Sequence, residues 1–260
     1  MTGINRQARR ELFDAARERL RTERCRTADE REAFAAFERR VRELDGWSTP
    51  VQNDVSGVTL AAAGSQRGLG AVREAYEATV MSVPHYSEEY DEPFEQHVCA
   101  EFGPDLAALL TQGQAFDSRT RQTVLAAASE AQETRDRLIR ALDDEQESFE
   151  DVVGELLSVL EELPEYEDAR FPKLSFGTLD AYRARLLVLE EKCNAAVDCR
   201  QESLVEQRRS LSLPIQGPDV PTYVYQDLEA TYPIVATAAD TLEHVESLRR
   251  DVERALSYSH

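Results

Sequence analysis

A stretch of forty residues without proline or glycine, 5–44, most restricts what this chain can fold into. It is rich in Arg, Glu and Ala, which favour helix, and Glu23, Thr27 and Glu30 interrupt its apolar pattern. The pattern predicts one long helix, or a helical hairpin whose second helix is capped by Asp29, with a coiled-coil-like stripe in either case. Two heptad positions form that stripe, one with Phe13, Leu20, Phe34 and Val41 and the other with Ala16, Phe37 and Leu44.

Three more long amphipathic segments follow, and together they predict an all-α fold: an antiparallel helical bundle with a long N-terminal coiled-coil-like helix or helical hairpin. In the first of them, Pro164 is expected to end the helix and the polar run 143–147 to allow a kink or a break. These segments run from Asp117-Ser118 to about Leu163, from Thr178 to about Leu211, and from Pro233 onward, with shorter helices expected over 70–83, 105–113 and 221–230.

Charge and turn residues divide the chain into three parts. Residues 1–44 hold twelve arginines against nine acidic residues and form a basic amphipathic arm. Residues 45–69 are rich in glycine and small polar side chains and read as a connection, in which 55–61 is a candidate extended piece. Residues 70–260 form a helical bundle with a strong acidic excess.

The overall composition favours a salt-rich environment. The formal charge is −20, and 28 of the 30 basic residues are arginine, Lys173 and Lys192 being the two lysines. Acid excess with so little lysine is the pattern expected at molar salt, where the Debye length falls to about 3 Å. We therefore expect a halophilic protein.

The termini and the cysteines favour a cytoplasmic protein. The first ten residues are polar and lack the apolar core of a secretory signal. The longest uncharged apolar stretch, 55–65, is far short of the roughly 20 residues of a membrane span. Four scattered cysteines without a CxxC pair are expected to be reduced thiols, with Cys193 packed in the core.

Catalytic signatures are missing from the sequence, so we expect a protein that is not an enzyme. None of the four histidines follows a glutamate by three residues, as a di-iron bundle requires. No Gly-x-Ser-x-Gly elbow occurs, and Gly68-Leu69-Gly70 lacks the strand context of a dinucleotide loop. No catalytic, cofactor-binding or metal-binding residue, no cofactor and no small-molecule ligand is predicted.

Residues 84–105 form the densest local signature, because seven acids alternate there with aromatic side chains and histidines and no basic residue occurs. One hypothesis is a recognition surface. An alternative is a structured loop that packs its aromatic side chains on the bundle, and a third is a metal-dependent enzyme in which His97 and Cys99 are zinc ligands with His85 or an acid. The candidate recognition residues are Pro84, His85, Tyr86, Tyr90, Pro93 and His97.

The basic arm suggests what the protein contacts. Its arginines could dock on an acidic face of its own bundle or of a second copy through arginine–carboxylate pairs. Contact with nucleic acid is the competing hypothesis and is disfavoured by the nine interleaved acids. Ordinary surface pairs along a solvated helix are the third. We expect a helical protein–protein interaction or regulatory protein, with a protein partner or self-association and no membrane contact.

Three runs of the chain carry a family resemblance. VPHYSEEYDEPFEQHVCAEFGPDLAALL, LEEKCNAAVDCRQ and TYVYQDLEATYPIV resemble a family of uncharacterised haloarchaeal helical proteins, a domain of unknown function. The resemblance covers most of residues 70–257 and is weaker in the arm. It implies an all-α, halophilic protein and carries no activity, cofactor or site residue.

Overall fold

A computed structural model describes residues 4–44, 68–113, 116–210 and 219–258. Within these ranges every element is an α-helix or a short 3-10 helix, which confirms the all-α prediction. The predicted connection falls almost wholly outside the described residues, and with it the candidate extended piece 55–61. Among the described residues, no helix combines the length and low charge needed to span a bilayer.

Residues 6–43 form a single helix, α1 (Arg6–Glu43), so the helical-hairpin alternative is wrong and Asp29 caps nothing. The reason is that the polar residues in the seam do not face water. Thr27 is buried, and Glu30 lies in a polar cluster described below. Their partners stabilise the middle of the helix in place of apolar contacts.

The chain divides into two compact units, and α1 and α6 (Ser118–Glu167) contribute residues to both. Unit 1 is Met1–Glu23 with Arg140–His260, and unit 2 is Arg24–Ile139. This division cuts through the predicted arm, because the two halves of α1 pack in different units. The predicted boundaries at 44 and 69 stay a prediction.

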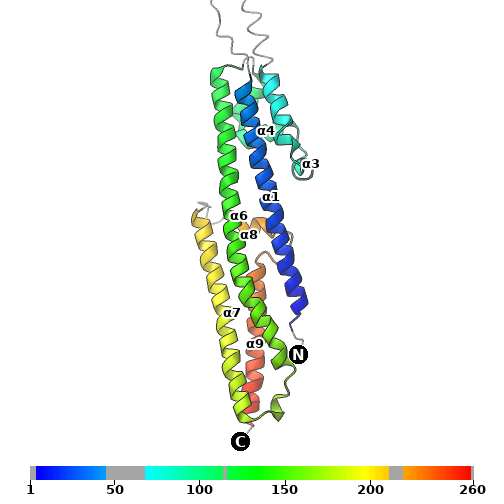
Figure 1. The fold of residues 1–260 in the computed structure, drawn as a ribbon, viewed down its shortest axis with the longest axis vertical. Helices are drawn as coiled ribbons and strands as arrows, with labels where there is room; N and C mark the ends of the chain where they lie inside the picture. Colours follow the sequence, from blue (N-terminus) through cyan, green and yellow to red (C-terminus); the bar gives the residue numbers. More distant parts are fainter. Residues whose placement is uncertain (1–3, 45–67, 114–115, 211–218, 259–260) are drawn as a thin grey trace, which may run out of the picture. The chain divides into compact units, whose positions relative to one another are not determined.

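Unit 1 is built from long antiparallel helices. It contains the start of α1, the second half of α6, η2 (Phe171–Lys173), α7 (Phe176–Ser210), α8 (Val220–Val224) and α9 (Pro233–Ser257). Ion pairs set the register of α7 against α6: Arg185 pairs with Glu162 at 2.5 Å, and Lys192 with Glu155 at 3.2 Å. Sequence position rises along one helix as it falls along the other, so the two are antiparallel (Figure 1).

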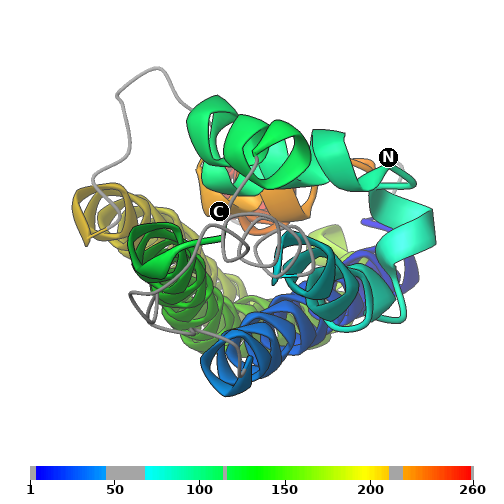
Figure 2. The same cartoon turned by 90° about the horizontal axis from the view of Figure 1, so that it is seen from above.

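Unit 2 combines the ends of two long helices with several short ones. It holds the second half of α1, a helix over 68–77, η1 (Val80–Ser82), α3 (Tyr86–Glu89), α4 (Phe94–Phe102), α5 (Pro104–Gln112) and the first half of α6. Here α1 and α6 lie side by side (Figures 1 and 2), and Arg31 pairs with Asp136 at 3.1 Å. Gly103, at φ 83°, takes the left-handed conformation that lets α4 stop and α5 start at Pro104.

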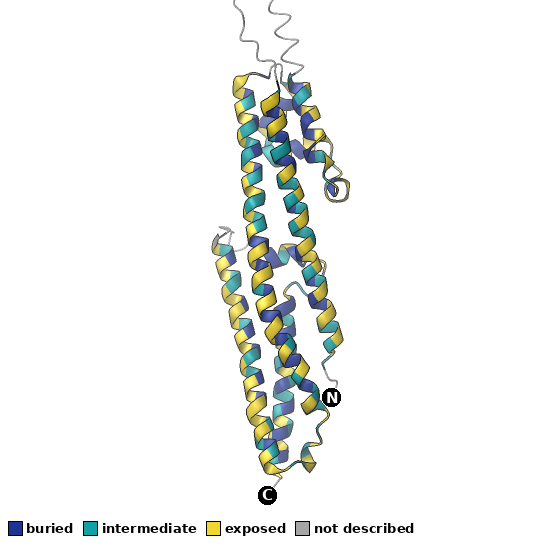
Figure 3. Cartoon of the chain, viewed as in Figure 1, coloured by how far each residue is buried: buried dark blue, intermediate teal, exposed yellow. Residues whose placement is uncertain are grey.

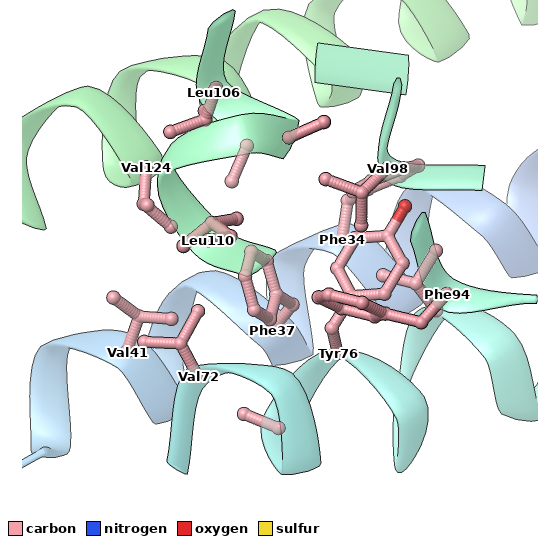
Figure 4. Close-up of a cluster of buried hydrophobic side chains, with 14 of the residues drawn as sticks. Phe34, Phe37, Val41, Val72, Tyr76, Phe94, Val98, Leu106, Leu110 and Val124 are labelled. Carbon is pink, nitrogen blue, oxygen red and sulfur yellow. The ribbon is translucent and has the colours of Figure 1, made fainter. Parts of the chain in front are cut away.

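The core of unit 2 combines a group of aromatic side chains with valines, leucines and alanines (Figure 4). Tyr76 is fully buried at its centre, with the ring centroids of Phe37 at 5.2 Å, Phe94 at 5.5 Å and Phe102 at 5.6 Å. These edge-to-face contacts join α1, the helix over 68–77 and α4. The predicted stripe residues Phe34, Phe37 and Val41 all belong to this core.

Two predictions about α6 are wrong. The helix continues through 143–147 without a break, because Glu145 is buried and paired inside unit 1. It also passes Pro164 and ends at Glu167. A proline there removes one backbone hydrogen bond, but Leu163 and Tyr166 on either side are buried and anchor the last turn. The predicted N-cap is confirmed, since Asp117 accepts a bond from the Thr120 amide at 2.7 Å.

Two other helix ends differ from the prediction. The helix over 68–77 gives way to η1 before Pro84, and the helix expected over 221–230 is only the short α8. Asp219 caps α8 by accepting from the Thr222 amide at 3.0 Å, so local side-chain bonds hold this segment in place of a longer helix.

Candidate functional site

The six predicted recognition residues divide between surface and interior. Pro84 and Pro93 are exposed, and Tyr90 is half-buried. His85, Tyr86 and His97 are buried, with 6%, 8% and 3% of their surface exposed. The aromatic and histidine side chains therefore face the interior of unit 2, and only the prolines lie open to a partner. Whether this segment binds one stays a prediction.

His97 is held by aromatic neighbours. Its Nδ1 lies 2.8 Å from the hydroxyl of Tyr76, and its ring packs against Tyr86 at 5.0 Å and Tyr90 at 4.9 Å between centroids. Burial lowers the pKa of His97, so the imidazole is kept neutral. Cys99, two residues further along α4, is exposed on another face, so the structure does not bring these two candidate zinc ligands together.

Glu30 of α1 is the hub of a second set of contacts in unit 2. Its Oε1 accepts from the Tyr90 hydroxyl at 2.7 Å and lies 3.3 Å from His85 Nε2, while its Oε2 accepts from Arg135 Nε at 3.0 Å. Its side chain is only 12% exposed. We call Glu30, His85, Glu89, Tyr90, Arg135 and Glu101 the Glu30 centre.

Arg135 of α6 links this centre to the core. It donates to both carboxylate oxygens of Glu101, at 2.7 and 2.6 Å, and its guanidinium lies 4.8 Å from the ring centroid of Phe34. Burial opposes its charge, but the carboxylates of Glu101 and Glu30 raise the pKa of Arg135 above its ordinary value. It is therefore a permanent cation held between two acids.

Glu89 closes the centre on its outer side. Its Oε2 lies 3.8 Å from His85 Nε2, and its Oε1 pairs with Arg26, which also binds Glu88 at 2.9 Å. Glu30, His85 and Glu89 thus bring one imidazole nitrogen and two carboxylate oxygens within 4.8 Å of one another. A nitrogen and oxygen set of this kind is what a transition-metal ion binds.

Unit 1 has a buried polar centre of its own, which we call the Glu145 centre: Glu145, Ser148, Arg200, Gln207 and Tyr225. Arg200 donates to the two oxygens of Glu145 at 2.6 and 2.8 Å and to Ser148 at 3.1 Å. Gln207 and Tyr225 also donate to Glu145, each at 2.9 Å. Glu145 is 0% and Arg200 2% exposed, so this pair is fully removed from water.

Neither centre was predicted, although the sequence carries a signal for both. Glu30 shares a heptad position with Ala16 and Phe37, and Glu145 shares one with Val152 and Val159. A charged residue at an inward-facing position of a predicted helix indicates a buried partner, because an unpaired buried charge is costly. Which residue supplies the partner could not be inferred from the spacing.

The predicted environment of Cys193 is confirmed. The residue is fully buried on α7, and burial raises the pKa of its thiol to about 11. It is therefore an unreactive core residue. Cys25, Cys99 and Cys199 are exposed.

The comparisons with known proteins confirm the resemblance to an uncharacterised domain family. No curated protein and no solved structure matches the chain. A family model described as a domain of unknown function, DUF7260, matches residues 11–249, which includes almost all of both units. The chain therefore belongs to the DUF7260 family, an uncharacterised domain family.

Proposed function

We propose that this is a non-enzymatic helical interaction protein that self-associates through the outward face of α7, in the salt-rich cytoplasm of a haloarchaeon. The observation that carries the proposal is the concentration of exposed apolar side chains on α7. Of the eight large hydrophobic residues exposed in the described part of the chain, four lie on this helix: Phe176, Leu187, Val188 and Val205.

The inner face of α7 already has its partners. Leu179, Leu186, Leu189 and Cys193 are fully buried in unit 1, where α7 packs against α9. Leu187 and Val188 are 45% and 38% exposed on the other side of the helix. Much of α7 is coloured as exposed in Figure 3. A helix that is apolar on both sides is typical of one that has a further partner.

The exposed patch of α7 suits pairing with a second copy. Ala181, Ala184, Leu187 and Val188 lie within two turns on the outward side and are all exposed. In a two-fold antiparallel pair centred on Ala184, Leu187 of one copy would lie over Ala181 of the other. Large side chains would then fill the space left by small ones, as in helix pairs with knobs-into-holes packing.

The acidic excess of the chain makes pairing depend on salt, and the second half of the same face is also acidic. Glu191, Asp198 and Glu202 are exposed there. The antiparallel pair places these charges of the two copies at opposite ends, so the repulsion that opposes pairing is the general one between two chains of formal charge −20. It is screened once the Debye length falls to about 3 Å near 1 M salt. Self-association of the −20 chain is therefore expected to increase with salt concentration.

The basic arm gives less support to nucleic-acid contact. Five of its arginines pair with acids from later parts of the chain in unit 1: Arg6 with Glu167, Arg9 with Asp240, Arg10 with Glu161, Arg17 with Glu150 and Arg19 with Asp227. Each pair favours docking of the arm on its own bundle over docking on phosphates.

The test is the molar mass of the full chain by light scattering between about 0.1 and about 3 M KCl, a range in which the Debye length falls from about 10 Å to below about 3 Å. We expect a dimer that becomes more populated as salt rises. Val188→Glu should give a monomer, because a buried unpaired carboxylate opposes association.

Leu109→Glu is the matched control, since Leu109 is also 38% exposed but lies on α5 in unit 2. It should leave the mass unchanged. A wild-type chain that stays monomeric at every salt concentration, or an equal loss of dimer in both variants, would overturn the proposal.

A further inference from the structure

We propose that Glu30, His85 and Glu89 bind a divalent transition-metal ion, with Zn²⁺ as the best-suited probe. This site goes beyond the proposed function, because it lies in unit 2 and does not involve α7. It also differs from the zinc site considered from the sequence, in which His97 and Cys99 were ligands together with His85 or an acid, because here His85 is joined by Glu30 and Glu89 and neither His97 nor Cys99 takes part.

The spacing of the three ligand atoms is wider than that of a short hydrogen bond and is close to that of ligands around one metal ion. His85 Nε2 lies 3.3 Å from Glu30 Oε1 and 3.8 Å from Glu89 Oε2. An N–H···O bond is usually about 2.9–3.0 Å long. Ligand atoms about 2.0–2.1 Å from a tetrahedral zinc are about 3.4 Å from one another. The 3.3 Å distance is close to an edge of such a ligand set, the 3.8 Å distance is somewhat longer, and all three ligand atoms lie within 4.8 Å of one another.

Each carboxylate has one oxygen fixed by an arginine and the other directed to His85. Arg135 Nε binds Glu30 Oε2 at 3.0 Å, and Oε1, which also accepts from the Tyr90 hydroxyl, lies on the side of the imidazole. Arg26 pairs with Glu89 Oε1, which leaves Oε2 in the same position. Outer partners of this kind orient metal ligands and are part of most metal sites.

The charges around the three ligands leave a negative excess. Arg26 pairs with Glu88 and Glu89, and Arg135 pairs with Glu30 and Glu101. Two guanidinium groups against four carboxylates give this group a formal charge of −2, which one divalent cation neutralises. The Glu145 centre, where one arginine meets one carboxylate, has no such excess.

The donor types select the class of ion. An imidazole with two carboxylates suits zinc, manganese or ferrous iron, whereas magnesium and calcium prefer oxygen ligands alone. Three protein ligands leave the fourth tetrahedral position for water or for a group from a partner. His85 is 94% removed from solvent, and Glu89, at 27% exposure, lies on the side from which an ion would enter.

The experiment is calorimetric titration of the full chain with zinc chloride alone, in a buffer free of chelators. Cys25, Cys99 and Cys199 are exposed and are alkylated first, so that their thiols do not bind zinc. We expect one zinc per chain. His85→Gln and Glu89→Gln should each weaken zinc binding at least about tenfold. Loss of an outer partner alone typically lowers metal affinity by about 10–100-fold, and these variants remove a ligand.

His244→Gln is the matched control. His244 Nε2 lies 2.7 Å from Glu167 Oε1, so it is also a histidine–glutamate pair, but its carboxylate is shared with Arg6 and, among the described residues, no second acid completes a set. This variant should bind zinc as the wild type does. Far-UV circular dichroism checks that each variant is folded, and Glu89→Gln, at the more exposed ligand, is the one least expected to disturb folding.

The site would be overturned by absence of stoichiometric zinc binding, or by binding that survives both His85→Gln and Glu89→Gln. An equal loss in His244→Gln would do the same. Val188→Glu should bind zinc normally, so a failed α7 interface and a failed metal site give different results.

Discussion

The two units each bury a polar centre, but the centres differ in charge balance and in access to water. In the Glu145 centre one guanidinium meets one carboxylate, both almost fully buried, and Gln207 and Tyr225 fill further positions on the carboxylate. In the Glu30 centre acids outnumber arginines, and exposure reaches 27% at Glu89. The charges of the Glu145 centre are balanced, whereas the Glu30 centre has an excess of negative charge that a cation can neutralise.

This difference indicates what each centre contributes. A closed, balanced pair fixes the register of α6, α7 and the segment after α8, because any shift would leave a buried charge unpaired. An acidic centre with a buried histidine and an open side is suited to binding. The same chain thus uses buried charge for specificity in one unit and, as we propose, for a ligand in the other.

The largest effect is expected for Glu145→Ala, which leaves Arg200 buried without its carboxylate. It should lower the free energy of unfolding by about 3–5 kcal/mol, measured by urea unfolding in concentrated KCl. The double variant Glu145→Leu with Arg200→Met should recover part of this loss, because no charge then stays buried. A single variant as stable as the wild type would show that the pair does not hold unit 1 together.

A smaller loss is expected for Arg135→Met, which removes a partner from both Glu30 and Glu101. These carboxylates keep 12% and 14% exposure, so water compensates in part. We expect a loss of about 2–3 kcal/mol in the same urea experiment. Arg31→Met is the control, since Arg31 also pairs with an acid of α6 but is 37% exposed. Equal losses of unfolding free energy in the two variants would mean that the arginine of the Glu30 centre contributes no more to stability than an arginine at the surface.

The free energy of unfolding should depend on pH in the way expected for a histidine, His97, that is kept neutral in the fold. The unfolded chain takes up a proton near pH 6.5, whereas burial holds His97 neutral to lower pH in the fold. Above about pH 6.5 the residue therefore contributes no pH dependence, and below it stability falls by at most about 1.4 kcal/mol per pH unit. His97→Gln should lose this part of the slope. Identical slopes in wild type and variant would contradict the assignment.

The smallest effect is expected at the exposed pair of Arg21 and Glu18, whose side chains are 71% and 67% exposed. Glu18→Ala should change the free energy of unfolding by no more than about 0.5 kcal/mol. The charged groups of Arg21 and Glu18 remain in water with or without the contact. The pair therefore gives a baseline against which the losses at the two buried centres can be compared. A loss above about 1 kcal/mol would mean that surface ion pairs dominate the stability of this chain.

Local structure was largely predictable from the sequence. The uninterrupted run 5–44 becomes one helix, the Asp117 cap is present, and Gly103-Pro104 separates two short helices. Errors arose where a local rule was opposed by burial. Pro164 fails to end α6 because Leu163 and Tyr166 are buried beside it, and the polar run 143–147 stays helical because Glu145 has buried partners.

The candidate site was predictable only in part. His85 and Tyr90 were identified from their segment, but Glu30 seemed to be an interruption of the seam, and Arg135 carried no signal. Fifty-five residues separate Glu30 from His85, and their meeting depends on how α3 packs on α1. No spacing within either segment encodes that contact.

The sequence by itself determined the helices, their approximate ends and the charge of the surface, because helix propensity, apolar period and capping act over a few neighbouring residues. Only the tertiary structure decided which acids meet which arginines, that α1 and α6 serve two units, and that His85 and His97 lie inside. Those outcomes follow from packing between segments far apart in the chain, where the cost of a buried unpaired charge selects one register among many.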